Sequence, residues 1–271
     1  MIRLRQVCLA TPRISDADVL ADILGVVIAH RDPLVSQFGL ENALLGLGGT
    51  FVEFIAPLRE GTTATRFLQK HPEGAGYMVI HDTDEFETIR ARVEAQGVRI
   101  AFESTPESRG PENNDPEYGY DSFRLVQLDP RSVGGTLMEF NQTAGNADLF
   151  GGYAPAGMSW QDTVQDVGLP KIVGAECTST DPEKMAHTWA SLMDKPVEQD
   201  GGGRSIIRLD DGSVDRFVAG ETSMFSRLLV DADDPQPILD RARAAGLDVD
   251  DSAFDFCGVT FVVLPRGRAE S

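Results

Sequence analysis

Two glutamates stand in segments with the alternating pattern of β-strands, and apolar side chains lie two residues away from each. Glu53 lies between Phe51 and Ile55, and Glu139 follows Leu137 in the same alternation, so each carboxylate shares a strand face with apolar neighbours. A carboxylate on such a face is costly unless it is paired, bound to a metal or protonated. The pattern favours a chemical role for both side chains. The alternative is that both lie on the exposed outer face of an antiparallel sheet.

Two such glutamates can transfer protons if they face one another. Like-charge repulsion and desolvation then raise one of the two pKa values, which leaves a carboxylate base beside a carboxylic acid. Such a pair can move a proton to and from a carbon next to a carbonyl group.

The strand and helix patterns recur in one order along the chain. The first unit has a strand over residues 3–10, a helix that ends at Gly25, a short strand over residues 26–29, and strands over residues 42–47 and 50–55. The same order begins again near residues 76, 172 and 226.

A repeat supports this division. Ile89 and Ile238 are 149 residues apart, and so are Gly97 and Gly246, which end the corresponding helices. The chain therefore reads as an α+β fold of four βαβββ modules arranged as two domains.

The domain boundaries follow from composition. Residues 1–145 form the first domain and residues 170–271 the second. The segment between them, residues 146–169, is rich in Gly, Ala and Pro and is interpreted as a linker. Tyr153 and Trp160 suggest that part of this linker packs.

These segments resemble the vicinal oxygen chelate superfamily, which includes glyoxalase I, methylmalonyl-CoA epimerase, extradiol dioxygenases and bleomycin-resistance proteins. The resemblance is strongest over residues 3–142 and rests on motifs in residues 6–12, 49–54, 74–84 and 129–140, in order and at module spacing. It implies that the four modules pair into two domains with cup-shaped mixed sheets. It also implies that the first and last strand of each module point one side chain at a divalent metal.

Carried over position by position, the resemblance implies Gln6 and Glu53 from the first module and Tyr77 and Glu139 from the second. Gln6, Glu53 and Glu139 would be metal ligands. Tyr77 stands where the family usually has histidine, and a phenol with a pKa near 10 is a poor ligand. The implied cofactor is one divalent ion of Mg, Mn, Fe, Ni, Co or Zn, and an all-oxygen set suits Mg or Mn better than Zn. The alternative is a metal-free site.

The implied activity is that of an isomerase, epimerase or lyase acting on a small enolisable or aromatic-derived oxygenated metabolite. Glu139, Glu53 and Tyr77 would be its catalytic residues, with Tyr77 donating to the developing oxyanion. The competing hypothesis is a non-catalytic small-molecule binder, like the antibiotic-sequestering members of the family. The missing histidine favours that hypothesis, and the retained Gln6, Glu53 and Glu139 count against it.

The second domain lacks an equivalent site, since its corresponding positions fall near Ala175, Arg216, Ser226 and Val263. An extradiol dioxygenase of the familiar two-domain kind needs two histidines and a glutamate there, so this reaction is excluded. The second domain is interpreted as structural, and Arg216 as a solvated strand arginine rather than an anion contact.

Two further features lie near the expected cup. His81 is placed on the same strand face as Tyr77, either as a substrate contact or as a surface residue at the strand end. Residues 106–121, which include Tyr118 and Tyr120, form a long loop. This loop is either a cover for the cup mouth or a disordered acidic excursion.

Composition excludes several classes of partner. Among 271 residues, 24 Lys and Arg oppose 43 Asp and Glu, for a formal net charge of −19, so nucleic acids and anionic membranes are unfavourable partners. No apolar stretch has the length of a membrane-spanning helix. Three widely separated cysteines read as reduced thiols, and the chain is expected to be cytoplasmic, as a monomer or a homodimer.

Overall fold

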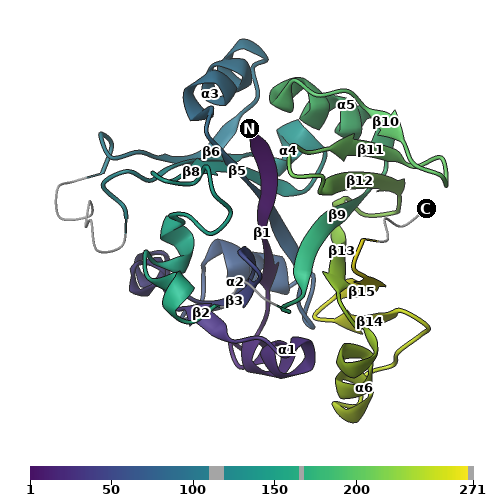
Figure 1. Cartoon of the computed structure of the whole chain (residues 1–271). Coiled ribbons are helices and arrows are strands. Elements are labelled where there is room, and N and C mark those ends of the chain that lie inside the picture. Colours follow the sequence, from purple (N-terminus) through teal and green to yellow (C-terminus); the bar gives the residue numbers. More distant parts are fainter. Residues whose placement is uncertain (110–118, 165–167, 268–271) are drawn as a thin grey trace.

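The chain folds into two mixed β-sheets flanked by helices, as a computed structural model of residues 1–109, 119–164 and 168–267 shows (Figure 1). The first sheet contains β1 (Ile2–Ala10), β2 (Ile28–His30), β3 (Leu40–Leu47), β4 (Thr50–Pro57), β5 (Ala75–Thr83), β6 (Ile100–Ser104), β7 (Arg124–Leu128) and β8 (Leu137–Gln142). The second contains β9 (Lys171–Ser179), β10 (Glu198–Gln199), β11 (Ser205–Arg208), β12 (Val214–Ala219), β13 (Met224–Ala232), β14 (Ala253–Phe256) and β15 (Val259–Pro265).

Helices connect the strands, and α1 ends where the sequence predicts. Gly25, with φ of 71°, follows α1 in the left-handed conformation that favours glycine at a helix C-terminus. The α-helices are α1 (Asp16–Leu24), α2 (Thr63–Leu68), α3 (Phe86–Ala95), α4 (Pro130–Val133), α5 (Pro182–Met193) and α6 (Gln236–Ala244), and short 3-10 helices cover Pro33–Phe38, Ala154–Ala156 and Trp160–Asp162. None of the helices in the described ranges has the length and apolar character of a membrane-spanning segment.

Each sheet is built from two modules joined at their first strands. In the first sheet, β1 pairs in parallel with β4 and antiparallel with β5, and β5 pairs in parallel with β8. In the second sheet, β9 pairs with β12 and β13 in the same way, and β13 pairs in parallel with β15. The predicted α+β fold of paired modules with cup-shaped mixed sheets is therefore confirmed.

The fourth module differs from the predicted pattern in one respect. Between α6 and β14, the described backbone forms only an isolated bridge from Val249 to Phe254, so this module contributes three strands to its sheet. The intervening residues 245–252 are few and include Asp248, Asp250 and Asp251, and a short, acidic segment is a poor strand former.

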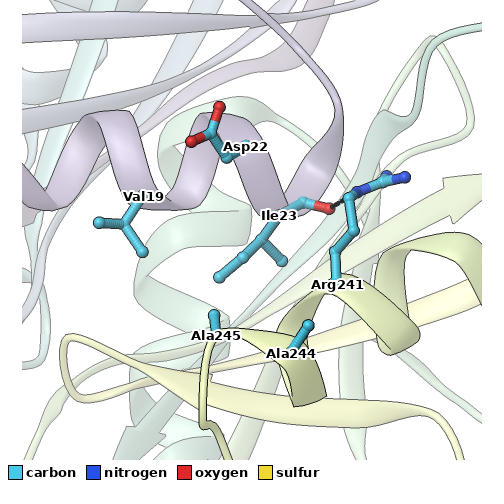
Figure 2. Close-up of a pocket in the computed structure, with 6 residues that line it drawn as sticks. All are labelled: Val19, Asp22, Ile23, Arg241, Ala244 and Ala245. Atoms are coloured by element: carbon cyan, nitrogen blue, oxygen red, sulfur yellow. Dashed lines mark hydrogen bonds between the residues drawn. The ribbon is translucent and has the colours of Figure 1, made fainter.

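The two sheets pack with their helices related by an approximate two-fold symmetry. Helix α1 of the first module packs against α6 of the fourth, and α3 of the second module packs against α5 of the third. At the first contact, Arg241 Nε donates to the Ile23 carbonyl over 2.8 Å, beside a small surface hollow that Val19 and Ala245 also line (Figure 2). This pairing of helices is what a duplicated two-module unit predicts.

His81 lies between the sheets, so its predicted place on the cup side was wrong. Its ring is fully buried, and Nε2 lies 2.9 Å from Asp215 Oδ2 on β12. The physical reason is a β-bulge: the register between β1 and β5 shifts between Gly76 and Met78, which breaks the strict alternation on which the prediction relied. Tyr77 and His81 consequently face opposite sides of the sheet.

The segment interpreted as a linker packs against the first sheet. The sheets themselves span residues 2–142 and 171–265, and Tyr153 and Trp160 from the segment between them are almost completely buried. The boundaries at residues 145 and 170 stay predictions.

Candidate functional site

The first sheet has one face against α1, α3 and the second sheet, and an opposite face, here called the cup face, that carries Gln6 and Glu53 and against which α2 packs. On this face Cys8 of β1 pairs with Glu53 of β4. Gln6 Nε2 donates to Glu53 Oε2 over 2.9 Å, and Asn42 Nδ2 of β3 donates to Glu53 Oε1 over 2.8 Å. Both oxygens of this carboxylate therefore accept an amide N–H.

Glu139 has the same kind of surroundings in the second module. Gln127 Nε2 of β7 donates to Glu139 Oε2, and Asn141 Nδ2 donates to Glu139 Oε1, both over 2.9 Å. In the sheet, Ile80 of β5 pairs with Gln6 on one side and with Glu139 on the other. The two glutamates thus lie on the same face, on the strands that close the two modules.

Burial raises the pKa of both glutamates. The Glu139 side chain is largely out of water, which raises its pKa to about 7; the bonds from Asn141 and Gln127 lower the pKa and the charge of Glu53 raises it further. Desolvation also raises the pKa of Glu53, against the lowering effect of its amide partners. Near neutral pH, one carboxyl group of the pair can hold a proton while the other is ionised.

Tyr153 joins the two halves of the site from the segment that the sequence predicts to be a linker. Its hydroxyl donates to Gln6 Oε1 over 2.8 Å and is in hydrogen-bond contact with the Asn141 side chain. Its ring stacks on Phe51 with centroids 5.1 Å apart, and Trp160 packs edge-on against the same ring of Phe51. A continuous chain of polar contacts therefore runs from Glu53 to Glu139.

Arg5 lies behind this aromatic cluster. It is completely buried, and its guanidinium carbon lies 4.8 Å from the Tyr153 ring centroid, 5.8 Å from that of Trp160 and 5.9 Å from that of Phe51. Among the described residues, none of its three nitrogens has a hydrogen-bond partner, and burial lowers its pKa to about 10. Its contacts in this site are cation–π contacts, which are strongest when the cation is desolvated.

Tyr77 lies on the cup face but outside this polar chain. Its ring packs edge-on against Phe67, with centroids 5.0 Å apart, and is partly exposed. Among the described side chains it has no hydrogen bond to Glu53 or Glu139. Burial raises the pKa of the Tyr77 phenol, so the hydroxyl keeps its proton at ordinary pH and remains a donor.

Tyr120, from the loop predicted near the cup mouth, contacts the surroundings of Glu53. Tyr120 is buried, and its hydroxyl donates to Asp32 Oδ2 over 2.6 Å. The backbone N–H of Asp32 in turn donates to Asn42 Oδ1 over 2.8 Å, which holds that amide with its nitrogen toward Glu53. Tyr118 and most of this loop lie outside the described residues.

The amide side chains of the site escaped the sequence analysis. Asn42 and Gln127 lie on strands beside those of the glutamates, and only the cross-strand register brings them close to Glu53 and Glu139. Asn141 is two residues from Glu139 on β8 and shares its face. One feature of the sequence indicated that Tyr153 packs, namely an aromatic side chain in a segment otherwise rich in Gly and Ala.

No family model matches the chain. It is 25% identical over 141 residues to the mouse mitochondrial methylmalonyl-CoA epimerase, covering 52% of this chain and 72% of the relative. It is also 25% identical over 142 residues to the ethylmalonyl-CoA/methylmalonyl-CoA epimerase of Cereibacter sphaeroides, covering 52% and 97%.

Solved structures match nearly the whole chain. A hypothetical protein from Staphylococcus aureus superposes with a TM-score of 0.67 at 10% identity, over 97% of this chain and 99% of that one. A mutant of 4-hydroxymandelate synthase from Streptomyces coelicolor gives 0.66 at 12% identity, over 92% and 75%. The predicted resemblance to the vicinal oxygen chelate superfamily is confirmed. These structural matches establish the fold.

Vicinal oxygen chelate proteins commonly bind a divalent metal, so the predicted ligands Gln6, Glu53 and Glu139 were tested against the geometry. Gln6 turns its N–H toward Glu53, and its oxygen accepts the Tyr153 hydroxyl. Amide N–H groups contact both oxygens of Glu139. In this orientation the amide hydrogens occupy the oxygens that would bind a metal ion, and metal binding by Gln6, Glu53 and Glu139 stays a prediction.

The second vicinal oxygen chelate sheet carries different residues at the equivalent positions. Strand register places Arg216 opposite Glu176 where the first sheet has Glu53 opposite Cys8. Arg216 is 2% exposed and forms ion pairs with Glu176 and Asp200. The interpretation of Arg216 as a solvated strand arginine is therefore wrong: on the buried middle of the sheet, adjacent carboxylates compensate its charge.

Proposed function

We propose that this vicinal oxygen chelate protein is an epimerase-type isomerase that moves a proton on a carbon next to a carbonyl group, with Glu53 and Glu139 as its acid–base pair. The observation that carries the proposal is the arrangement of these two carboxyl groups. Each one is held by two amide N–H donors on the same sheet face, and the pKa of Glu139 is raised to about 7. A group with a pKa near the working pH is suited to both halves of a proton transfer.

The reaction balances with these two groups alone. The ionised glutamate removes the proton from the α-carbon, so that the C–H bond breaks, an O–H bond forms on the glutamate and the electron pair passes to the carbonyl oxygen. The protonated glutamate then delivers its proton to the opposite face of the enolate carbon, which restores the carbonyl with inverted configuration. After one turnover the two glutamates have exchanged protonation states, and proton exchange with water resets them.

Tyr77 is the proposed donor to the enolate oxygen. It keeps its proton because burial raises the pKa of its phenol, and it lies on the same face as both glutamates, beside apolar residues such as Met78 and Leu137. A neutral donor placed where negative charge develops stabilises the enolate more than the ground state.

The proposed substrate class is a small enolisable acyl thioester. Support comes from the similarity, over about half of this chain, to epimerases whose names give methylmalonyl-CoA and ethylmalonyl-CoA as substrates. The α-proton of a thioester whose α-carbon also carries a carboxylate is acidic enough for a glutamate base in a site of low polarity. Lyase chemistry would begin with the same abstraction, and no step here requires the predicted metal. A cytoplasmic location and a monomeric or homodimeric state stay predictions.

The proposal is tested by incubating the protein with single-enantiomer methylmalonyl-CoA in D2O. The wild type is expected to incorporate deuterium at the α-carbon and to invert its configuration, and Glu139→Gln and Glu53→Gln are expected to lose at least about 100-fold in rate. Glu41→Gln is the matched control, because Glu41 is next to Asn42 on β3 and therefore faces the other side of the sheet. Binding without exchange would identify a sequestering protein, and exchange that survives in both glutamate variants would refute the assigned pair.

A further inference from the structure

Tyr153 reaches the site from outside both sheets. It follows the last strand of the first sheet, β8, and precedes the first strand of the second, β9, yet its side chain is completely buried. Its hydroxyl contacts Gln6 from the first module and Asn141 from the second. One side chain from the connecting segment therefore touches an amide partner of each glutamate.

The hydroxyl acts as a donor at all ordinary pH values. Burial raises the pKa of the Tyr153 phenol well above its usual value of 10, so the proton stays on the oxygen. The hydroxyl donates a hydrogen bond to Gln6 Oε1. Because the Gln6 oxygen is engaged, its Nε2–H group is the one that faces Glu53.

Asn141 is fixed in the corresponding way. Its Nδ2 group donates to Glu139 Oε1, and the amide also contacts the Tyr153 oxygen, whereas its buried Oδ1 atom has no hydrogen-bond partner in the described part of the chain. A buried carbonyl oxygen without a donor is unfavourable. The reversed orientation of the Asn141 amide would be still less favourable, since it would place the Oδ1 atom against the carboxylate of Glu139.

We propose that Tyr153 is a positioning residue for the acid–base pair: it holds the Gln6 and Asn141 amides with their N–H groups toward Glu53 and Glu139. This inference rests on the proposed function for its catalytic meaning and on the geometry for its structural content. N–H donors stabilise the charged form of a carboxylate and so lower its pKa. Tyr153 therefore limits how far burial raises the pKa of each glutamate and links the two groups through one hydroxyl.

The aromatic cluster around Tyr153 explains how a connecting segment can hold such a position. The Tyr153 ring is stacked on Phe51 with an interplanar angle of 12°, and the guanidinium of Arg5 lies 4.8 Å from its centroid. Trp160 closes the cluster and donates from Nε1 to the Gly151 carbonyl. The aromatic rings and the guanidinium of Arg5 hold the Tyr153 ring in place. The hydroxyl can therefore be removed while the packing of the ring is kept.

The test is Tyr153→Phe, which keeps the ring and removes only the hydroxyl. The readout is the carboxyl pKa of Glu53 and Glu139, measured by 13C NMR titration with the side-chain carboxyls labelled and assigned through Glu53→Gln and Glu139→Gln. We expect Tyr153→Phe to raise at least one of the two pKa values by about half a unit or more. Trp160→Phe, which perturbs packing and keeps the hydroxyl, should leave both values within about 0.2 units of the wild type.

A second variant guards against a folding defect. Gln6→Met removes the acceptor of the Tyr153 hydroxyl and the N–H donor to Glu53, so it should raise the pKa of Glu53 at least as far as Tyr153→Phe does. Unchanged pKa values of both glutamates in folded Tyr153→Phe, or equal shifts in Trp160→Phe, would overturn the positioning role.

Activity distinguishes this inference from the proposed function. Shifted carboxyl pKa values in a protein that catalyses no α-proton exchange would leave the role of Tyr153 standing and refute the epimerase proposal. Exchange activity with an unshifted pH–rate profile in Tyr153→Phe would support the epimerase proposal and refute the positioning role of Tyr153.

Discussion

Gln127 Nε2 donates to Glu139 Oε2 over 2.9 Å from the residue directly opposite on the neighbouring strand. Asn42 also donates to Glu53 from the neighbouring strand, β3 to β4, but from a diagonal position, since Asn42 pairs with Ile55. Each module thus supplies a glutamate on its closing strand and an amide on the strand beside it. The matched arrangement is what duplication of a module predicts, and it gives the two carboxyl groups similar surroundings.

Replacing Gln127 should change the acidity of its partner. Gln127→Leu removes an N–H donor to the charged form of Glu139, so the pKa of Glu139 is expected to rise above its value of about 7. Measurement is by 13C NMR titration of the carboxyl groups. Gln37→Leu, at an exposed position, is the control and should leave the titration unchanged. A fall in the pKa of Glu139 would contradict the assigned hydrogen bond.

Glu139 should also make folding stability depend on pH. Its folded-state pKa of about 7 lies above the ordinary value of 4.5, so this contribution to stability is fully present below about pH 4.5 and is lost as pH rises through about pH 7. The loss amounts to about 3 kcal/mol, as an order of magnitude. In urea unfolding from pH 4.5 to 8, Glu139→Gln is expected to flatten this decline. A decline of the same size in the variant would show that another group causes it.

The buried pair between the sheets is expected to matter for stability. His81 Nε2 lies 2.9 Å from Asp215 Oδ2, and both side chains are almost completely buried. Asp215→Leu leaves the imidazole without its partner and should lower the free energy of unfolding by about 3 kcal/mol. The double variant His81→Leu/Asp215→Leu should recover most of this loss in the same denaturation experiment. Additive losses would show that the two side chains act independently.

The contact between α1 and α6 gives a smaller and separate effect. Arg241 Nε donates to the Ile23 carbonyl in the last turn of α1 (Figure 2). Arg241→Met should therefore lower the free energy of unfolding by about 1 kcal/mol and leave proton exchange unchanged. Arg243→Met on the same helix, where the guanidinium pairs with Asp240 within one turn, serves as the control and should have a smaller effect.

Much of the fold follows from local pattern. Alternating strands and helices ending in glycine specify the modules, and the position of Gly25 after α1 shows how a single residue sets a helix end. Glu53 and Glu139 could be placed on one face because their strands run without interruption. The relative orientation of Tyr77 and His81 could not be predicted in this way, because the bulge between Gly76 and Met78 breaks the two-residue period of the strand.

The partners of the glutamates depend on contacts distant in sequence. Asn42 is 11 residues from Glu53 and Gln127 is 12 residues from Glu139, and only the pairing register brings them together. Tyr153 is 147 residues from Gln6 and sits in a segment without strand or helix periodicity. No local signal reports such a contact, beyond the aromatic residue itself.

The 13C carboxyl titration of the wild-type protein beside Glu139→Gln tests the proposed acid–base pair most directly. One carboxyl group of the wild type is expected to titrate near pH 7, in line with the raised pKa of Glu139, and its signal is expected to be absent from the variant. In Glu53→Gln the pKa of Glu139 is expected to fall, because the charge of Glu53 raises it. If every glutamate of the wild type titrates near its ordinary value, the two groups do not form a proton-sharing pair, and the proposed chemistry is wrong.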